Sequence, residues 1–590
     1  MREKELGIWH EYDWDKTWNL VVDAAHGLLA FDFKMGDRLT IHAEDRPEWV
    51  IMDLATVALR GITVGLYPTN PAAEVVYTIN DCGSNIHIVE DQEQADKVID
   101  QPASDYPTIE KIIYIEPRGI RRSEDERLLS WDEFLAIGRE HRAANPGAVD
   151  RIMDTAEASD VMTLVYTSGT TGPPKGAMIT NENAQFGIDV ILRTPERVRG
   201  GKLPGPSDSV LTYLPLCHIA ERLFSTWHLA GQGVVLNFAE SVESVNLNLR
   251  EIQPTLFFAV PRVWEKLHAS VIIKGSDSSP IKKWLLNFWL KRASWIGKQR
   301  VANNGDWTAA TRVVYAIGWV FMYRALRERL GLRRVRWTGS GAAPIAPEVL
   351  EFFMGLGIDV FELYGMTENT AVATANLVGR VRLGSVGEPY PAIKDGFRLD
   401  PVTGEIQVKH DGVFAGYWGK PEQTAATMTD DGWLMTGDVG EWVDGDFVRI
   451  IDRIKHIIIT AGGKNISPSE IENTLKTSPY INEAMVIGDR RKYLTALIAI
   501  ELETVGSWAL KQNIPYTTYR DLSEKPEVLA MIAKEVERTN EKFARVEGIK
   551  KFKLIPKELD HEDGELTATQ KLKRSSVEDT FRDLVESMYS

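Results

Sequence analysis

The stretch VMTLVYTSGTTGPPKGAM, residues 161–178, joins an apolar, β-branched run to a loop of hydroxyl residues, glycines and prolines. Open α/β sheets bind ligands in such loops, beyond the carboxyl ends of buried strands. Glycine lets backbone N–H groups approach phosphate oxygens, and Lys175 adds a positive charge. The loop is not a Walker-type P-loop, because no hydroxyl residue follows the lysine. Taken alone it indicates phosphate binding, and a Ser/Thr/Gly linker is the alternative.

The sequence around this loop alternates between short apolar runs and helical patterns. Between about residues 39 and 265 the runs are RLTIHAE, GITVGLYPT, NIHIVED, KIIYIE, VMTLVYTS, GVVLNFAE and TLFFAVP. Because they lack strict polar alternation, they predict strands covered on both faces, in layered α/β architecture with parallel sheet. Two later runs, RRVRWTGSGAAP and IDVFELYGMTE, also end in glycine and hydroxyl residues, where a ligand would bind.

The residue pattern changes after Gly384, where hairpin-like segments with Gly and Asp turns begin, including GEIQVKHDG and DGDFVRIIDR. These segments predict a β-barrel-like subdomain. A second domain is predicted to begin near Asp452, with a turn-rich loop, a helix, two strands around EAMVIGD and TALIAIE, and a final helical region. We therefore expect an α/β protein with a large N-terminal domain of layered, doubly wound sheets, residues 1–451, and a small α+β domain, residues 452–590.

Composition limits the classes of function. The 590 residues exceed what one core usually holds, which agrees with two or more domains. Only two cysteines occur, Cys82 and Cys217, which argues against a disulfide framework and against a thiolate metal cluster. The net charge of −16 argues against a nucleic-acid binder. The charged N-terminus, MREKELGIWHEYDWDKTW, lacks the apolar core of a secretory signal, so we expect a cytoplasmic protein.

Residues 281–334 differ from the rest of the chain in charge. They hold twelve Lys or Arg residues, two acids and five Trp. Basic side chains with interleaved Trp, Leu and Phe at helical spacing are typical of an interfacial amphipathic helix, which would give peripheral contact with the inner face of the membrane. The alternative is a helical hairpin packed on the domain, and we favour it because such stripes are usually core.

The loop at Tyr166–Met178 resembles the phosphate-loop signature of the adenylate-forming superfamily, which comprises acyl-CoA synthetases, luciferases and nonribosomal-peptide adenylation domains. Further matches follow in the superfamily's order: YLPLCHIAER (213–222), GSGAAPI (339–345), YGMTE (364–368), TGD (436–438), DRIKHIIITAGGKNISPSEIE (452–472) and GELTATQKLKR (564–574). The strings AGGKNISP and KLKR are most similar to the long-chain fatty acyl-CoA synthetase branch. That branch usually has TPT where this chain has TATQ.

The resemblance implies an ATP site. The residues expected around the β- and γ-phosphates are Thr167, Ser168, Gly169, Thr170, Thr171, Gly172 and Lys175. Thr367 would contact the α-phosphate, and Glu368 would hold Mg²⁺, a hard cation that prefers oxygen ligands. The residues expected around adenine are Tyr364, Gly365, Gly341, Ala342 and Ala343. Asp438 would accept hydrogen bonds from both ribose hydroxyls.

The resemblance also implies a mobile small domain. Lys571 would be its catalytic cation, with Lys573 as a neighbour that could replace it, and Lys455 would be the hinge. Arg453 would contact the nucleotide. Rotation would present Gly462 and Gly463 to coenzyme A, whose 3′-phosphate would meet Arg490 and Arg491 or cations of residues 281–334.

Taken without the resemblance, several of these residues have plainer interpretations. Glu368 would be an acid at a helix entry, Asp438 a turn residue and KLKR a solvated helix start. His218, a catalytic-site side chain in the relatives, would be a packed core histidine.

The sequence as a whole predicts an AMP-forming ligase that uses ATP, Mg²⁺ and coenzyme A to activate a long, apolar carboxylic acid. Two alternatives stay open. One is an acyl-AMP ligase that loads a carrier protein, although such relatives usually read Tyr-Gly-x-Ala-Glu at residues 364–368. The other is a pseudoenzyme that binds nucleotide or acyl group without turnover. The sequence does not specify which acid is used or the oligomeric state.

Overall fold

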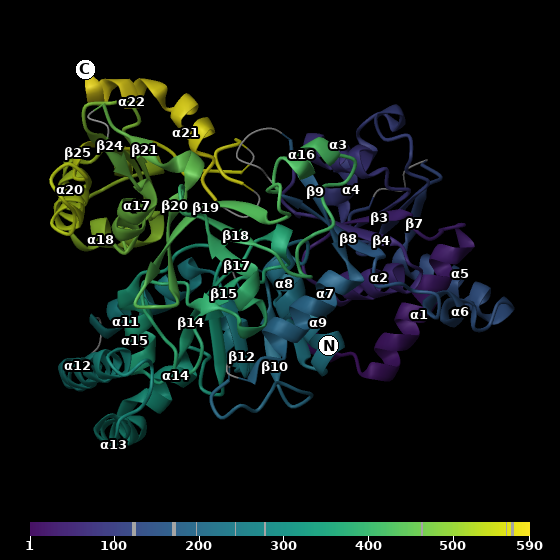
Figure 1. Ribbon diagram of the computed structural model, residues 1–590, viewed down its shortest axis with the longest axis horizontal. Coiled ribbons are helices and arrows are strands. Elements are labelled where there is room, and N and C mark those ends of the chain that lie inside the picture. The colour runs from purple at the N-terminus through teal and green to yellow at the C-terminus, as the bar shows by residue number, and fades with distance from the viewer. Residues whose placement is uncertain are drawn as a thin grey trace.

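The computed structural model of the chain describes residues 1–120, 125–167, 173–195, 198–241, 244–276, 279–461, 464–561, 563–567 and 571–590 (Figure 1). Its largest sheet has seven strands in the order β7-β6-β5-β3-β4-β8-β9. The bounds are β3 (Arg38–His42), β4 (Ile62–Leu66), β5 (Ile86–Val89), β6 (Lys111–Tyr114), β7 (Leu128–Ser130), β8 (Val161–Thr167) and β9 (Lys175–Thr180). All neighbours are parallel except β8 and β9, so the loop that opened the sequence analysis joins an antiparallel pair.

Two further sheets lie beside it. One has the order β10-β11-β1-β2, and the other has the order β12-β13-β14-β15-β16. Their bounds are β1 (Arg2–Glu5), β2 (Ile8–Glu11), β10 (Ser209–Thr212), β11 (Val235–Phe238), β12 (Leu256–Ala259), β13 (Trp337–Ser340), β14 (Val360–Tyr364), β15 (Thr374–Ala375) and β16 (Glu388–Pro389). Every predicted apolar run forms a strand. The hairpin β1–β2 was not predicted, because its residues are mostly charged; it pairs in parallel with β11.

Helices cover these sheets. Those before β12 are α1 (Trp14–Ala30), α2 (Pro47–Ala58), α3 (Ala72–Cys82), α4 (Gln92–Ile99), α5 (Trp131–Ala144), α6 (Ala148–Met153), α7 (Asn181–Gly187), α8 (Ile219–Phe224), α9 (Thr226–Gln232) and α10 (Val245–Ile252). Local signals fix their starts: at α5, Ser130 and Glu133 form a reciprocal capping box. Side chains of α1, α2, β3 and β8 share one buried core, which holds the strand ends in place.

A further group of helices follows β12 and includes the basic segment. They are α11 (Pro261–Ser276), α12 (Pro280–Val301), α13 (Ala309–Gly318), the π-helical turn η4 (Trp319–Tyr323), α14 (Arg324–Arg329) and α15 (Pro347–Gly355). Residues such as Trp289, Ala293 and Ile296 pack into a second core, as the hairpin interpretation predicts. None of the helices that the structure describes combines the length and apolar character needed to span a membrane.

The predicted hairpins form an antiparallel sheet, β17 (Phe397–Leu399), β18 (Glu405–Val408), β19 (Leu434–Val443) and β20 (Phe447–Arg453). The N–H of Val386 donates to the Val448 carbonyl, and the Val448 N–H donates to Gly387, which ties β20 to the chain before β16. After β20, the short turn η7 (Ile454–His456) leads into the C-terminal part, drawn in yellow-green in Figure 1.

The C-terminal part has its own core. Its strands are β21 (Ile458–Ile459), β22 (Asn465–Ile466), β23 (Ile481–Ile487), β24 (Leu494–Ile500) and β25 (Ile549–Leu554). Its helices are α17 (Pro468–Lys476), α18 (Leu502–Lys511), α19 (Tyr519–Ser523), α20 (Pro526–Asn540), α21 (Arg574–Thr580) and α22 (Arg582–Tyr589). The predicted helix and two strands are α17, β23 and β24. The final region was predicted to be helical only, but β25 lies within it and pairs in parallel with β24.

Candidate active site

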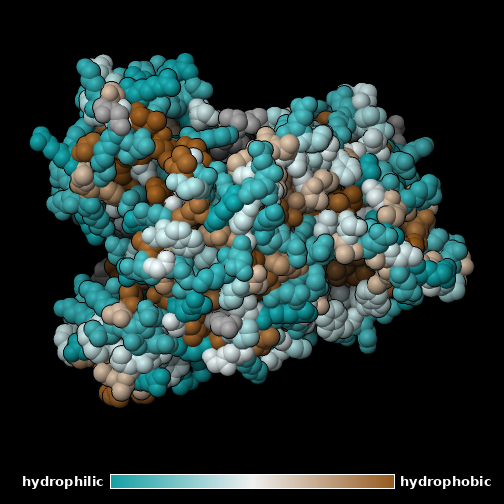
Figure 2. Space-filling model, viewed as in Figure 1, coloured by the Kyte–Doolittle hydropathy of each residue, from teal (hydrophilic) through white to brown (hydrophobic). Residues whose placement is uncertain are grey.

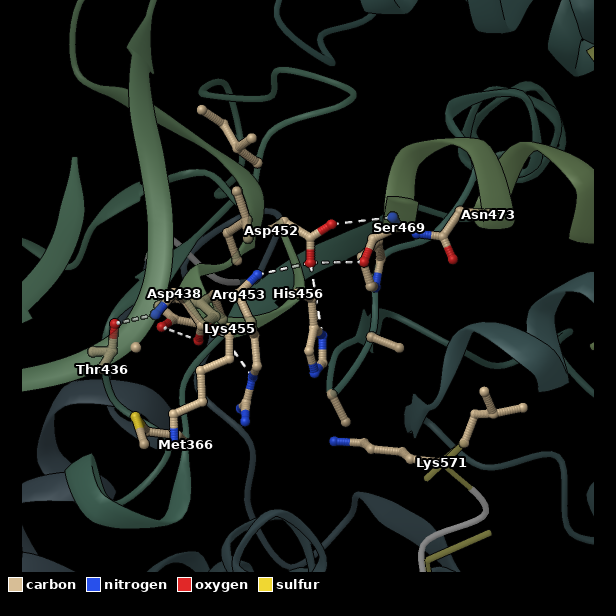
Figure 3. Close-up of a pocket in the computed structure, with 18 of the residues that line it drawn as sticks. Met366, Thr436, Asp438, Asp452, Arg453, Lys455, His456, Ser469, Asn473 and Lys571 are labelled. Carbon is tan, nitrogen blue, oxygen red and sulfur yellow. Dashed lines mark hydrogen bonds and ion pairs between the residues drawn. The ribbon is translucent and has the colours of Figure 1, made fainter. Parts of the chain in front are cut away.

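A cleft of about 2090 Å³ lies between the sheets of the N-terminal part and the C-terminal part. Three strands end at it: Thr167 closes β8, Gly341 follows β13 and Tyr364 closes β14. The cleft therefore lies beyond the carboxyl ends of strands, as the sequence predicts. β19 and β20 of the antiparallel sheet also line the cleft, and η7 and the chain near Lys571 close it from the C-terminal side (Figure 3).

Asp438 of β19 joins two of the predicted site residues. The Tyr364 hydroxyl donates to its Oδ2 at 2.7 Å, and the Arg453 Nε donates to its Oδ1 at 3.1 Å. Asp438 and Tyr364 are buried, whereas the Arg453 side chain is half exposed. Burial raises the pKa of Tyr364 well above its ordinary value, so the hydroxyl remains a donor. The group presents an aromatic face beside a fixed carboxylate.

Glu368 is held by an aromatic residue from a distant segment. It lies in the 3-10 turn η5 (Thr367–Asn369), and its Oε1 accepts a hydrogen bond from the Tyr417 hydroxyl at 2.6 Å. No described residue donates a hydrogen bond to its Oε2. The ammonium of Lys175 lies 4.4 Å from the centre of the Tyr417 ring, a cation–π distance. Tyr417 thus joins the Glu368 carboxylate to the lysine at the start of β9.

Tyr417 reaches this position because its segment pairs with β9. The Met178 N–H donates to Gly416, and the Trp418 N–H donates to Gly176, both within 3 Å. Sequence analysis missed Tyr417, since the contact joins residues about 240 positions apart. Its only local signal is an aromatic pair between glycines in FAGYWGK.

His218 lines the cleft as the N-cap of α8. Its Nδ1 accepts a hydrogen bond from the Ala220 N–H at 3.2 Å, which places the ring proton on Nε2. Burial, and then the nearby positive charge of Lys571, lower the pKa of His218 to about 4. The imidazole is therefore neutral at pH 7 and can offer an Nε2–H donor to a ligand.

Lys571 enters the cleft from the C-terminal part. Figure 3 shows its side chain extending toward Arg453 and His456. The Thr567 N–H donates to the Lys571 carbonyl at 2.7 Å, but no described residue pairs with the Lys571 ammonium. Enclosure by the cleft walls, and then repulsion from Arg453, lower the pKa of Lys571. A cation with no ion-pair partner among the described residues thus faces the same space as the Asp438 group.

Asp452 is a second residue whose importance the sequence did not reveal. It lies just before the turn η7 that contains Lys455, and it is buried. Its carboxylate accepts hydrogen bonds from Ser467 Oγ at 2.7 Å and from both N and Oγ of Ser469, at 3.1 and 2.9 Å (Figure 3). These bonds join the end of β20 to the start of α17 and so fix the C-terminal part in this orientation.

The cleft also has an apolar region, lined by Ile191, Ile219, Phe224, Phe258 and Ile345. Phe224 and Phe258 stack with their ring centres 4.4 Å apart. The same region contains the buried carboxyl of Glu362, whose pKa burial raises to about 8. Because Glu362 is mostly protonated at pH 7, it adds no charge to this wall. The region suits a hydrocarbon rather than an ionic group.

The structure brings most of the predicted residues together. The members that line the cleft are Thr167, Lys175, His218, Gly341, Ala342, Ala343, Tyr364, Gly365, Thr367, Glu368, Asp438, Arg453, Lys455 and Lys571, together with Arg490 and Arg491. Ser168, Gly169, Thr170, Thr171, Gly172, Gly462 and Gly463 lie outside the described residues. Arg491 pairs with Glu586, and Arg490, whose side chain is 92% exposed, pairs with Asp489 at 3.7 Å.

The chain matches known protein families along most of its length. Residues 4–418 match the family described as AMP-binding enzyme, and residues 455–590 match the AMP-binding enzyme C-terminal domain. The long-chain-fatty-acid–CoA ligase ACSBG2 of Xenopus laevis is 30% identical, over 100% of this chain and 81% of the relative. The long-chain-fatty-acid–CoA ligase FadD15 of Mycobacterium bovis is 29% identical, over 99% of this chain and 93% of the relative.

Solved structures share the fold. The adenylation domain of a carboxylate reductase from Mycobacterium chelonae has a TM-score of 0.72 and 20% identity, covering 98% of this chain and 85% of that one. The anthranilate CoA ligase AuaEII, solved with anthranoyl-AMP, has a TM-score of 0.69 and 19% identity, covering 98% of this chain and 93% of that one. At such identities the likeness establishes the α/β architecture with its additional C-terminal domain.

Proposed function

Because the chain belongs to the AMP-binding enzyme family, we propose that it is an AMP-forming ligase that joins a long-chain fatty acid to coenzyme A. Two relatives that align over nearly the whole chain are named long-chain-fatty-acid–CoA ligases. One observation carries the proposal: Lys571, near the C-terminus, shares a cleft with Lys175, Tyr364 and Asp438. The proposal includes the division into residues 1–451 and a mobile domain of residues 452–590.

The first half-reaction activates the acid. A carboxylate oxygen attacks the α-phosphorus of ATP, the bond to the bridging oxygen breaks, and pyrophosphate leaves. The substrate carboxylate is already ionised at pH 7, so the site needs no general base. It needs positive charge and hydrogen-bond donors around phosphate oxygens whose charge is redistributed in the transition state. Lys175 supplies charge from the β9 side of the cleft, and Lys571 supplies it from the opposite side.

The Asp438 group suits the nucleoside. Its carboxylate would accept hydrogen bonds from the ribose hydroxyls, the Tyr364 ring would pack against adenine, and Arg453 would contact ribose and phosphate. The backbone of Gly341, Ala342 and Ala343 would form the other adenine face. We also propose that Thr367 and the residues from Thr167 to Gly172 contact the phosphates of ATP.

Glu368 suits Mg²⁺. Its Oε2 accepts no hydrogen bond from a described residue, and a carboxylate oxygen is a ligand this cation prefers. The Tyr417 hydroxyl, bonded to Oε1, would hold the carboxylate in one orientation. Bound there, the cation would neutralise phosphate charge. His218, neutral and with its Nε2–H free to donate, would orient the carboxylate or the adenylate.

The second half-reaction needs a thiol. The sulfur of coenzyme A attacks the acyl carbonyl, the bond to AMP breaks, and AMP leaves. We propose that rotation about Lys455 withdraws Lys571 and brings Gly462 and Gly463 toward the pantetheine arm, with Arg490 near the 3′-phosphate. The bonds of Asp452 to Ser467 and Ser469 span Lys455 in the sequence, so a rotation about Lys455 would strain them.

The apolar wall supports a hydrocarbon substrate. Phe224, Phe258 and Ile191 offer no charge or exposed hydrogen-bond donor to a ligand. Two names among the relatives specify long-chain fatty acids, and the chain length accepted by this protein is part of the proposal. The carrier-loading alternative has structural neighbours such as the carboxylate reductase adenylation domain, with which this chain shares its fold.

Pyrophosphate release tests the proposal. The protein is incubated with ATP, Mg²⁺ and carboxylic acids of graded length, each with and without coenzyme A. We expect release that requires a long-chain acid and accelerates with coenzyme A, with acyl-CoA and AMP as products. Release that ignores coenzyme A while acyl-AMP accumulates would instead support the carrier-loading alternative. No release with any acid would contradict a ligase and favour a pseudoenzyme.

A further inference from the structure

The outer face of α13 and η4 is apolar where a water-facing helix is normally polar. Val313, Ile317, Val320 and Phe321 have exposed fractions of 59%, 48%, 77% and 62%. Their spacing, i, i+4, i+7 and i+8, places them on one stripe of the helix. Figure 2 shows brown side chains at the lower left end of the molecule, where Figure 1 labels α13.

A second set of exposed apolar side chains lies on α12. Phe321 stacks on Trp289 of α12 with their ring centres 6.0 Å apart, so the two helices meet at this point. On α12, Ile281, Trp284 and Trp295 have exposed fractions of 80%, 66% and 40%. Residues 281, 284, 288 and 295 share one helix face by their spacing. We call these exposed side chains of α12, α13 and η4 the apolar face.

The same segment also carries exposed cations. The exposed Lys and Arg residues of the segment are Lys282, Lys283, Lys291, Lys298, Arg312, Arg324, Arg329, Arg333 and Arg334. The two acids of the segment are already paired: Asp306 with Arg199, and Glu328 with Arg333. The segment that carries the exposed apolar side chains therefore also carries an excess of exposed cations, on a chain whose net charge is −16.

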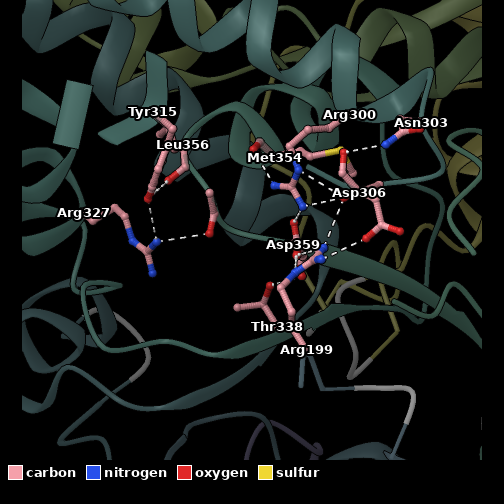
Figure 4. A network of polar contacts seen from close by, with 12 residues as sticks. Arg199, Arg300, Asn303, Asp306, Tyr315, Arg327, Thr338, Met354, Leu356 and Asp359 are labelled. Atoms are coloured by element: carbon pink, nitrogen blue, oxygen red, sulfur yellow. Dashed lines mark hydrogen bonds and ion pairs between the residues drawn. The ribbon is translucent and has the colours of Figure 1, made fainter. Parts of the chain in front are cut away.

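Two of the twelve basic residues of this segment, Arg300 and Arg327, are buried and stabilise the fold (Figure 4). Arg300 is buried and donates to Asp359 Oδ1 at 2.6 Å and to the Met354 carbonyl at 3.0 Å. Arg327 is buried and donates to the carbonyls of Leu332 and Gly357 at 3.1 Å. As the packed-hairpin interpretation predicts, α12 and α13 are fixed to the domain on one side, and they present the apolar face on the other.

We propose that the apolar face docks on the surface of an anionic lipid bilayer. Exposed Trp, Phe and aliphatic side chains would enter the interface between headgroups and acyl chains, and the cations would meet lipid phosphates. A second copy of the chain is a poorer occupant, because two such faces would bring like charges together. The proposal does not depend on the catalytic function, since it concerns binding to vesicles.

Vesicle flotation of the full-length protein tests the proposal. The probes are phosphatidylcholine vesicles with and without 30 mol% phosphatidylglycerol, at 50 mM and 500 mM NaCl. We expect flotation with the anionic vesicles at low salt, weaker flotation at high salt and little with neutral vesicles. Absence of flotation with anionic vesicles at low salt would overturn the proposal.

Two variants separate the apolar and the electrostatic contributions. Val313→Ser/Val320→Ser removes exposed apolar groups only, and should lower vesicle affinity about tenfold. Lys291→Ala/Arg324→Ala removes two cations and should lower it about 20-fold. Matched controls are Val402→Ser, at a side chain that is 90% exposed in the turn between β17 and β18, and Lys534→Ala, at an exposed position of α20.

The controls should bind vesicles like the unmodified protein. Equal binding by all variants would overturn the proposal, because vesicle binding would then use another surface. The proposal would also be overturned if vesicles do not bind and sedimentation velocity shows a dimer that Val313→Ser/Val320→Ser dissociates. Circular dichroism of each variant, matching that of the unmodified protein, excludes misfolding as the cause of a loss.

Discussion

The two walls of the cleft differ in how firmly their functional side chains are held. On the N-terminal side, Asp438 accepts hydrogen bonds from Tyr364 and Arg453, and Glu368 accepts one from Tyr417. On the C-terminal side, no described residue pairs with the Lys571 ammonium. A wall with fixed acceptors is suited to bind a nucleotide, because little conformational freedom is lost on binding. A cation without a fixed partner is suited to one reaction step and to withdrawal before the next.

Removal of the Lys571 ammonium should give the largest effect among the variants that test this difference between the two walls. We expect Lys571→Ala to slow acyl-AMP formation by about 10²–10³-fold, the loss typical of a single transition-state donor. Thioester formation from supplied acyl-AMP should stay within about threefold, because the cation is withdrawn in that step. Rapid-quench assays of each half-reaction measure both rates.

Lys573→Ala is the matched control for Lys571, since it removes a cation two residues away. It should leave both half-reactions near the unmodified rates. Equal losses from the two variants would mean that the segment contributes general positive charge rather than one positioned cation.

Substitutions in the wall of fixed acceptors should lower the affinity for the nucleotide rather than slow one half-reaction. Asp438→Ala leaves the Tyr364 hydroxyl and Arg453 without their acceptor, and removes the acceptor proposed for the ribose. We expect the KM for ATP to rise about 10–100-fold, because each lost hydrogen bond to a charged group costs about 1.5–3 kcal/mol. Titration of AMP binding by calorimetry measures the effect directly. An unchanged affinity for AMP would show that Asp438 does not bind the nucleotide.

Tyr417 makes two contacts that mutation can separate. Tyr417→Phe keeps the ring over Lys175 but removes the hydrogen bond to Glu368. We expect the Mg²⁺ concentration for half-maximal adenylation to rise about threefold to tenfold, from the loss of one hydrogen bond that orients the carboxylate. Tyr417→Leu, which also removes the ring, should lower activity further. If the two variants behave alike and Mg²⁺ dependence is unchanged, the hydroxyl does not position Glu368.

His218 should give the smallest effect, seen as a pH dependence of stability. Its pKa is about 4 in the folded protein, against an ordinary value of 6.5. Between these values the unfolded chain binds more protons, so stability is lost as the pH falls from 6.5 toward 4. From pH 7 to pH 5 this histidine should cost the folded state about 2 kcal/mol.

Urea unfolding at the two pH values checks this difference. His218→Gln should lose correspondingly less stability on acidification than the unmodified protein. His10→Gln, at an exposed position of β2, is the control and should follow the unmodified protein. An equal loss in His218→Gln would show that His218 is not held neutral.

The sequence predicted the motif residues and the strands that apolar runs form, because both depend on local pattern, but it did not predict the short strands β7 and β10 or the strand β9, which begins at Lys175 of the predicted loop. Each apolar run forms a strand, and the motif residues lie where those strands end. Tyr417 and Asp452 could not be found in this way, because their importance comes from partners in other segments. The charged hairpin β1–β2 was missed because its strand pairing, not an apolar pattern, holds it.

The basic segment shows a different limit of sequence analysis. Its composition favours a membrane interface and its helical spacing favours a packed hairpin, and neither separates buried from exposed positions. Arg300 and Arg324 look alike in the sequence, yet Arg300 is fully buried against Asp359 and Arg324 is exposed. Only the packing of α12 and α13 on the domain decides between them.

Transfer of labelled oxygen tests the proposed reaction most directly. A long-chain fatty acid carrying ¹⁸O in both carboxylate positions is incubated with the protein, ATP, Mg²⁺ and coenzyme A, and the AMP is analysed by mass spectrometry. Attack of the carboxylate on the α-phosphorus, followed by thioester formation, predicts AMP that carries one ¹⁸O, together with an equal amount of acyl-CoA. Unlabelled AMP, or ADP and phosphate as the products, would contradict an adenylate intermediate and with it the proposed division between the two walls.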